Sequence, residues 1–225
     1  MSEGMDRRRL MVAGAALAAA GPALAQSPAS PPAPAASPNA ESVPAPLVVL
    51  YTPLGAIEVA LAADKAPITV ANFLRYVDAR RFDGAHFYRA MKLTASPLTG
   101  LVQGGPQNDP TKAFPPIAHE STLKTGLHHL DGTISMARYA PGTATSEFFI
   151  CVGTIPSLDA DPTASGDNEG FAAFGQVSQG MGVVRKILLS PTSPMQGQGE
   201  MKGQMLSPPI PILSARRLVG GHLVP

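Results

Sequence analysis

From residue 47 onward, short apolar runs alternate with turn residues along the chain. Residues 56–61 place Ile57, Val59 and Leu61 at every second position, which predicts a strand with one buried face. Comparable apolar runs predict further strands over residues 47–51, 85–89, 101–103, 133–137, 148–152, 174–178 and 212–218. This part of the chain is therefore expected to be mainly β.

Two segments instead show the period of a helix. Pro67 suits the first position of a helix, because its φ is already fixed and its missing N–H has no partner to lose there. Apolar residues follow it at positions i, i+3, i+4 and i+7: Val70, Phe73, Leu74 and Val77. Residues 181–189 have a similar apolar side and stop before Pro191. Many short strands with only two helices favour a closed antiparallel β-barrel whose openings the helices cover.

Residues 1–25 have the pattern of an export signal. Three arginines at positions 7–9 precede an apolar stretch over residues 10–20, and Ala23-Leu24-Ala25 matches an A-x-A cleavage site. The stretch is too short to span a bilayer, so no stable membrane insertion is expected after cleavage. The arginines also resemble a twin-arginine signal, although Asp6 replaces the usual Ser or Thr. We expect export to a bacterial periplasm, with the general secretory and twin-arginine routes both open.

Composition divides the rest of the chain. Residues 26–46 are nearly all Pro, Ala and Ser, which predicts an extended, disordered tether. A globular domain is expected over residues 47–219, followed by a tail over residues 220–225. The formal net charge is +1, and the only basic run is at residues 7–9, so a nucleic-acid partner is not expected.

The single cysteine, Cys151, excludes an intramolecular disulfide. It lies in an apolar run, where cysteine usually behaves as a small buried hydrophobe rather than as a nucleophile. His119, His128 and His129 lack the spacing of a metal site. We therefore expect neither a metal nor a cofactor.

Four segments, in this order, resemble the cyclophilin family. They are residues 87–89 (FYR) with 103–105 (QGG), residues 132–138 (GTISMAR), residues 146–150 (SEFFI), and residues 174–177 (FGQV) with 180–181 (GM). The resemblance covers roughly residues 47–218. It implies a closed eight-stranded antiparallel β-barrel capped by two α-helices, with the substrate groove on the outer wall. The implied activity is peptidyl-prolyl cis–trans isomerisation of exported client proteins, by a monomer that binds proline-containing peptides and unfolded chains.

By the same resemblance, Arg89 is the catalytic residue. A donor aimed at the nitrogen of a twisted amide binds the transition state better than either planar ground state, and a guanidinium offers charged donors in a rigid fork. Residues at ten further motif positions are expected to bind substrate: Phe87, Leu101, Gln103, Met136, Ala137, Arg138, Glu147, Phe149, Leu158 and Phe171. Among these, Leu101, Met136, Phe149 and Leu158 would form the apolar proline pocket.

The sequence also departs from the family pattern. Residues 90–100 are longer than the usual connection, which predicts a lengthened loop beside the groove. Glu147 stands where many members have Gln, and its carboxylate could bond Arg89 bidentately. The acidic segment over residues 159–170 is expected to be a solvated loop. These departures leave open a second function, namely a binding or chaperone module that holds proline-containing segments with little turnover.

Overall fold

The computed structural model describes residues 45–94, 96–107, 109–219 and 222–223. The predicted signal peptide, residues 1–25, lies outside these ranges, as do residues 26–44 of the predicted tether. The elements in chain order are β1 (Leu47–Thr52), β2 (Gly55–Leu61), α1 (Pro67–Asp78), β3 (His86–Leu93), β4 (Ser96–Gly105), α2 (Thr122–Thr125), β5 (Thr133–Met136), β6 (Phe148–Val152), η1 (Pro156–Leu158), β7 (Ala172–Gln179), α3 (Met181–Leu189), β8 (Thr192–Ser193), η2 (Gly199–Met201), β9 (Met205–Pro211), β10 (Ser214–Val219) and β11 (His222–Leu223).

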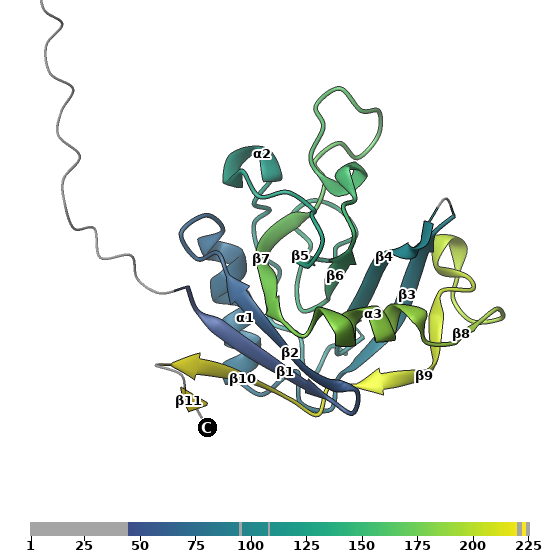
Figure 1. The fold of residues 1–225 in the computed structure, drawn as a ribbon. Coiled ribbons are helices and arrows are strands. Elements are labelled where there is room, and N and C mark those ends of the chain that lie inside the picture. The colour runs from purple at the N-terminus through teal and green to yellow at the C-terminus, as the bar shows by residue number, and fades with distance from the viewer. Residues whose placement is uncertain (1–44, 95, 108, 220–221, 224–225) are drawn as a thin grey trace, which may run out of the picture. The chain divides into compact units, whose positions relative to one another are not determined.

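The strands form one antiparallel sheet in the order β11-β10-β1-β2-β7-β5-β6-β4-β3-β9-β8. The sheet curls around the core (Figure 1). A mainly β, antiparallel fold is therefore confirmed. The details differ from the prediction of a closed eight-stranded barrel. The described residues form eleven strands, and the order of these strands is linear, with β11 and β8 at its ends.

Three strands near the C-terminus were not indicated by the sequence: β8, β9 and β11. In addition, β3 and β4 are longer than predicted and form a hairpin. β9 contains three prolines, at positions 208, 209 and 211, and proline normally argues against a strand because it cannot donate to the ladder. β11 belongs to the segment expected to be a tail, and it pairs with β10. The expected long loop over residues 90–100 is instead an extended hairpin, in which Leu93 pairs with Ser96.

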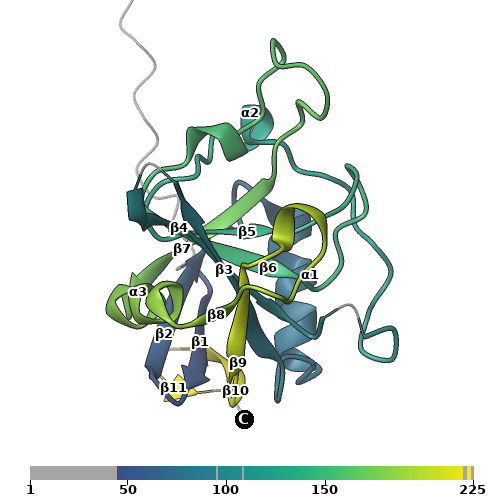
Figure 2. The same cartoon turned by 90° about the vertical axis from the view of Figure 1, so that its right-hand side faces the viewer.

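Both predicted helices are present. α1 begins at Pro67 and buries its apolar stripe, as the sequence indicated, and it contacts β7 and β10. α3 contacts β2, β3, β4 and β6, and Figure 2 shows the two helices on opposite sides of the molecule. α2 is a single additional turn. Within the described ranges, no helix has both the length and the apolar character needed to cross a membrane.

β6 is buried on both faces, and this arrangement separates the core from the site. Phe148, Ile150 and Val152 face the main core, where the ring of Phe148 makes edge-on contacts with three other phenylalanines. Phe149 and Cys151 point to the opposite side and form a second, smaller cluster with Leu101 and Ile155. The smaller cluster supplies the floor of the candidate site.

Candidate active site

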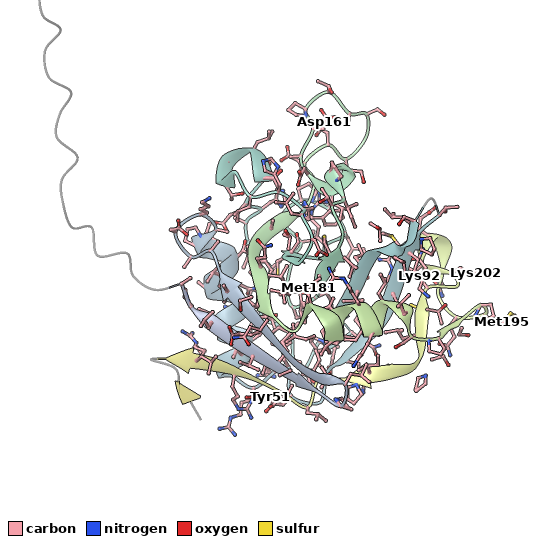
Figure 3. All side chains as sticks on the ribbon, viewed as in Figure 1. Tyr51, Lys92, Asp161, Met181, Met195 and Lys202 are labelled. Atoms are coloured by element: carbon pink, nitrogen blue, oxygen red, sulfur yellow. The ribbon has the colours of Figure 1, made fainter. Side chains whose placement is uncertain are left out.

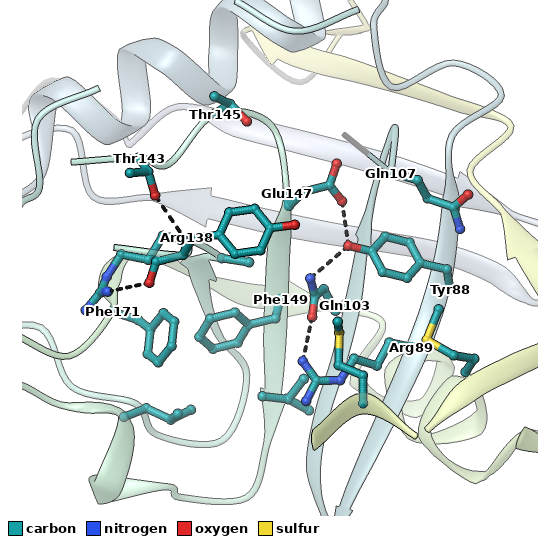
Figure 4. Close-up of a pocket in the computed structure, with 16 residues that line it drawn as sticks. Tyr88, Arg89, Gln103, Gln107, Arg138, Thr143, Thr145, Glu147, Phe149 and Phe171 are labelled. Carbon is teal, nitrogen blue, oxygen red and sulfur yellow. Dashed lines mark hydrogen bonds between the residues drawn. The ribbon is translucent and has the colours of Figure 1, made fainter. Parts of the chain in front are cut away.

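A pocket of about 500 Å³ lies over the second cluster, between β3, β4, β6 and the segments that follow Met136, Pro156 and Gly199 (Figure 4). Residues predicted to act on or bind substrate make up much of its lining: Arg89, Leu101, Gln103, Ala137, Arg138, Glu147, Phe149, Leu158 and Phe171. The remaining lining residues were not predicted: Tyr88, Gln107, Tyr139, Thr143, Thr145, Met201 and Met205. The family motifs thus locate the pocket but not its full wall.

Two residues predicted to contact substrate, Phe87 and Met136, lie in the main core instead, with 0% and 1% of their surfaces exposed. The alternation of the strands explains both positions. Met136 pairs with the core residue Phe148, so it shares that face of the sheet. At Phe87, the register shifts before Arg89 in the pairings with both neighbouring strands, and the irregularity lets both Tyr88 and Arg89 reach the pocket. Tyr88 stands inside the FYR motif, but strict alternation along the strand would have placed its side chain on the other face of the sheet from Arg89.

Arg89 is held by two amide oxygens. Its Nη1 donates to Gln103 Oε1 at 2.9 Å, and its Nε donates to Gln204 Oε1 at 2.8 Å. Partial burial lowers the pKa of Arg89, and the neighbouring Tyr88 opposes the effect. An arginine remains protonated in spite of such a shift, so the site contains a cation whose orientation is fixed.

Glu147 reaches Arg89 through other side chains, and the expected bidentate pair is not what the structure has. Tyr88 donates its hydroxyl to Glu147 Oε2 at 2.7 Å, and Gln103 Nε2 donates to the Tyr88 oxygen at 2.8 Å (Figure 4). Burial, together with the charge of Glu147, raises the pKa of Tyr88, so the phenol keeps the proton that it donates. Because the Tyr88 hydroxyl donates its proton to Glu147, its oxygen accepts from the Gln103 amide nitrogen, and the oxygen of Gln103 therefore faces Arg89.

Aromatic contacts hold Phe149 in the pocket floor. The ring of His129 stacks on Phe149 with centroids 5.8 Å apart, and Phe171 meets it edge-on at 5.4 Å. His129 is buried and fixed at both nitrogens, by Asp159 at 2.5 Å and by the Ser135 hydroxyl at 3.0 Å. Burial lowers the pKa of His129. The floor is therefore a rigid apolar surface beside the cation of Arg89.

Comparison with known proteins identifies this architecture. A sequence profile of the family described as "Cyclophilin type peptidyl-prolyl cis-trans isomerase/CLD" matches residues 47–216. The chain belongs to the cyclophilin family. It is similar to a peptidyl-prolyl cis-trans isomerase of Acinetobacter baylyi, with 39% identity over 65% of this chain and 74% of the relative. It also resembles a peptidyl-prolyl cis-trans isomerase of Streptomyces antibioticus, with 33% identity over 76% of this chain and 98% of the relative.

Solved structures support the fold. A cyclophilin-type isomerase of Cryptosporidium parvum matches with a TM-score of 0.61 and 19% identity, covering 78% of this chain and 99% of that one. A structure of the same protein in the presence of the dipeptide Ala-Pro matches with a TM-score of 0.59 and 20% identity, covering 75% and 96%. The family and the named relatives give this cyclophilin its activity, peptidyl-prolyl cis–trans isomerisation.

In this cyclophilin the side chain of Arg138 is bonded to other residues of the protein and is 2% exposed. Its guanidinium donates to both oxygens of Asp167 and to the carbonyl of Gly170, and it lies 5.0 Å from the ring centre of Phe171. The hydrogen bonds from Arg138 lower the pKa of Asp167. The Asp167 carboxylate thus fastens the acidic segment beside the pocket, whereas Asp161 lies in the part of the same loop that projects from the molecule (Figure 3).

Cys151 lies beneath the floor of the pocket and is fully buried. Burial raises the pKa of its thiol to about 12, so the thiolate needed for nucleophilic chemistry is scarce at neutral pH. Within the part of the chain that the structure describes, no three His, Cys, Asp or Glu side chains gather as metal ligands would.

Proposed function

We propose that Arg89 accelerates rotation about X-Pro bonds by donating a hydrogen bond to the imide nitrogen in the twisted state. The barrier of roughly 18–20 kcal/mol comes from conjugation between this nitrogen and the carbonyl. When the bond is perpendicular, the nitrogen recovers its lone pair and becomes a hydrogen-bond acceptor. A charged donor held at that position therefore favours the transition state over both planar isomers.

The third nitrogen of the guanidinium supports this role. Nε and Nη1 of Arg89 are occupied by Gln204 and Gln103, whereas Nη2 donates to no described residue. No fully buried side-chain nitrogen or oxygen in the described ranges lacks a partner, so Nη2 must be accessible. Arg89 also lines the same pocket as the apolar residues Leu101 and Phe149. An accessible charged donor beside an apolar floor is the observation on which the proposal depends.

We further propose that the proline ring rests on Phe149, Leu101 and Leu158 while the acyl side turns. An apolar floor suits a pyrrolidine ring and excludes competing water. The main chain at Ala137 and Arg138 would pair with the extended peptide on either side of proline. Main-chain contacts discriminate little between sequences, so we expect a broad range of unfolded proline-containing clients.

Turnover and binding are separated by a protease-coupled assay on a short X-Pro peptide, together with a titration of peptide binding. An isomerase accelerates the slow phase in proportion to its concentration. A module that only binds would sequester the peptide without such acceleration. A slow phase that is independent of protein concentration, in the presence of measurable binding, would favour the binding module.

We also propose that the protein acts on exported clients in a bacterial periplasm. The support is the n-region at residues 7–9, the apolar stretch over residues 10–20 and the cleavage site at Ala23-Leu24-Ala25. We expect the mature protein in the periplasmic fraction to begin at Gln26, which N-terminal mass spectrometry would show. Replacement of Arg7 and Arg8 by lysine tests the route: blocked export indicates the twin-arginine system, and normal export indicates the general one.

Glu147→Gln is expected to lower kcat/KM by about two- to tenfold, the range that one modest hydrogen bond contributes. A glutamine amide both donates and accepts, so the Tyr88 hydroxyl is no longer obliged to point away from Gln103. Tyr88→Phe breaks the same chain and should have a similar effect. Glu58→Gln, on the distant strand β2, is the matched control. Unchanged kinetics in both Glu147→Gln and Tyr88→Phe would show that the chain is functionally idle.

A further inference from the structure

Arg89 receives its second contact from a part of the chain that no motif indicated. Gln204 lies between η2 and β9, 115 residues from Arg89 in sequence, and its Oε1 accepts the hydrogen bond from Nε. Gln103, on β4, accepts from Nη1. A guanidinium is planar and rigid, so contacts at two of its nitrogens fix its plane. The nitrogen that neither glutamine contacts is Nη2.

The amide of Gln204 is itself fixed in one orientation. Its Nε2 donates to the backbone carbonyl of Glu200 at 2.7 Å, and the amide oxygen therefore faces Arg89. The main chain is anchored as well, because the Gln204 carbonyl accepts from the N–H of Ala90 at 2.9 Å. The next residue, Met205, is the register partner of Arg89. Gln204 thus approaches Arg89 from an adjacent backbone.

The segment over residues 194–204 has a defined fold of its own. The N–H of Gly203 donates to the carbonyl of Gln196 at 2.9 Å, which closes the segment at its base. Gly197 has a φ of 92°, and a Cβ at that position would lie 2.2 Å from the Met201 carbonyl oxygen, so the turn needs glycine. Met201 and Met205 line the pocket. The segment is therefore part of the site wall, whereas Met195 lies at the outer edge of the molecule (Figure 3).

We propose that Gln204 is a positioning residue for isomerisation: it holds Arg89 Nε so that Nη2 faces the imide nitrogen. This inference rests on the proposed catalytic role of Arg89. Without the contact at Nε, the guanidinium can rotate about its bond to Gln103 and spends less time aligned with substrate. Small losses of alignment at a reacting centre have large effects on rate. Peptide binding depends on the apolar floor, so it should not depend on Gln204.

The test compares Gln204→Met, which keeps the length of the side chain but removes the acceptor, with Gln198→Met in the same segment. Gln198 is exposed and provides the matched control. NMR exchange spectroscopy on an X-Pro peptide gives the on-enzyme rate and the Kd separately. We expect Gln204→Met to lower the rate about tenfold, with Kd and Tm unchanged and with a shifted, faster-exchanging Arg89 Nε–H signal. Gln198→Met should match the parent protein in every measurement.

A double variant shows whether the effect passes through Arg89. In the Arg89→Ala background, Gln204→Met should cause no further loss, because the group that it positions is absent. An equal loss in both backgrounds would overturn the proposal, as would full activity of Gln204→Met when Arg89→Ala is inactive. Full activity of Arg89→Ala would instead overturn the proposed catalytic role itself, and the role of Gln204 with it.

Discussion

Arg89→Ala is expected to lower kcat/KM for an X-Pro peptide by about 10²- to 10³-fold, because one preorganised donor at a reacting centre contributes roughly 2.7–4 kcal/mol to the transition state. The loss should appear in the isomerisation rate, since the donor acts on a nitrogen that accepts only in the twisted state. Peptide affinity should change little, because Phe149 and Leu101 remain in place. The protease-coupled assay measures the first quantity and a peptide titration the second.

Two further variants make the result specific. Arg89→Lys keeps the charge, but a lysine ammonium cannot contact Gln103 and Gln204 through a rigid fork and still present a third donor. We expect its activity to lie between those of the parent protein and the alanine variant. Arg185→Ala removes an arginine that is 49% exposed and paired with Asp131 on the surface, and it should be silent. A kcat/KM unchanged in Arg89→Ala would exclude the proposed mechanism.

The regular parts of the fold could be predicted because local pattern and tertiary burial agree there. Ile57, Val59 and Leu61 alternate and are buried as expected, and α1 starts at its proline. Much of the pocket could be predicted for a different reason, namely the resemblance of four motifs to the cyclophilin family. The structure places motif residues on the adjacent strands β3, β4 and β6, so segments that are separate in sequence meet in the sheet.

The features that were missed depend on tertiary structure. An irregular register at Phe87 cannot be read from alternation, and it determines that Tyr88 reaches the pocket while Phe87 enters the core. A strand with prolines is recognisable only once its partner is known, and Gln204, which contacts Arg89, immediately precedes that strand, β9. The partner of Glu147 also differs from the one suggested: Glu147 and Arg89 belong to separate motifs of one expected site, and their opposite charges suggest a direct pair. The intervening phenol of Tyr88 changes that expectation.

Adjacent residues on β6 provide a second decisive test, because the strand presents Phe148 to the main core and Phe149 to the pocket. Phe148 is fully buried among Phe73, Phe82 and Phe87. Truncation to alanine would leave a closed cavity, which costs about 3–5 kcal/mol of unfolding free energy. In a chain of this size that corresponds to a fall in Tm of roughly 6–20 °C. Below the new Tm, kcat/KM should stay close to that of the parent protein.

Phe149→Ala should have the opposite effect: a small loss of stability and a large loss of kcat/KM. Its ring faces the pocket, so the space left by truncation opens to water and the loss of stability is expected to be smaller than for Phe148→Ala. The proline ring loses its main apolar contact, worth roughly 1.5–3 kcal/mol, and kcat/KM should fall by about 10- to 100-fold with a weaker peptide Kd. Thermal unfolding followed by circular dichroism, with activity measured where both variants are folded, separates the two effects. If Phe149→Ala instead unfolded as early as Phe148→Ala and bound peptide normally, the floor of the site would have to lie elsewhere on the sheet.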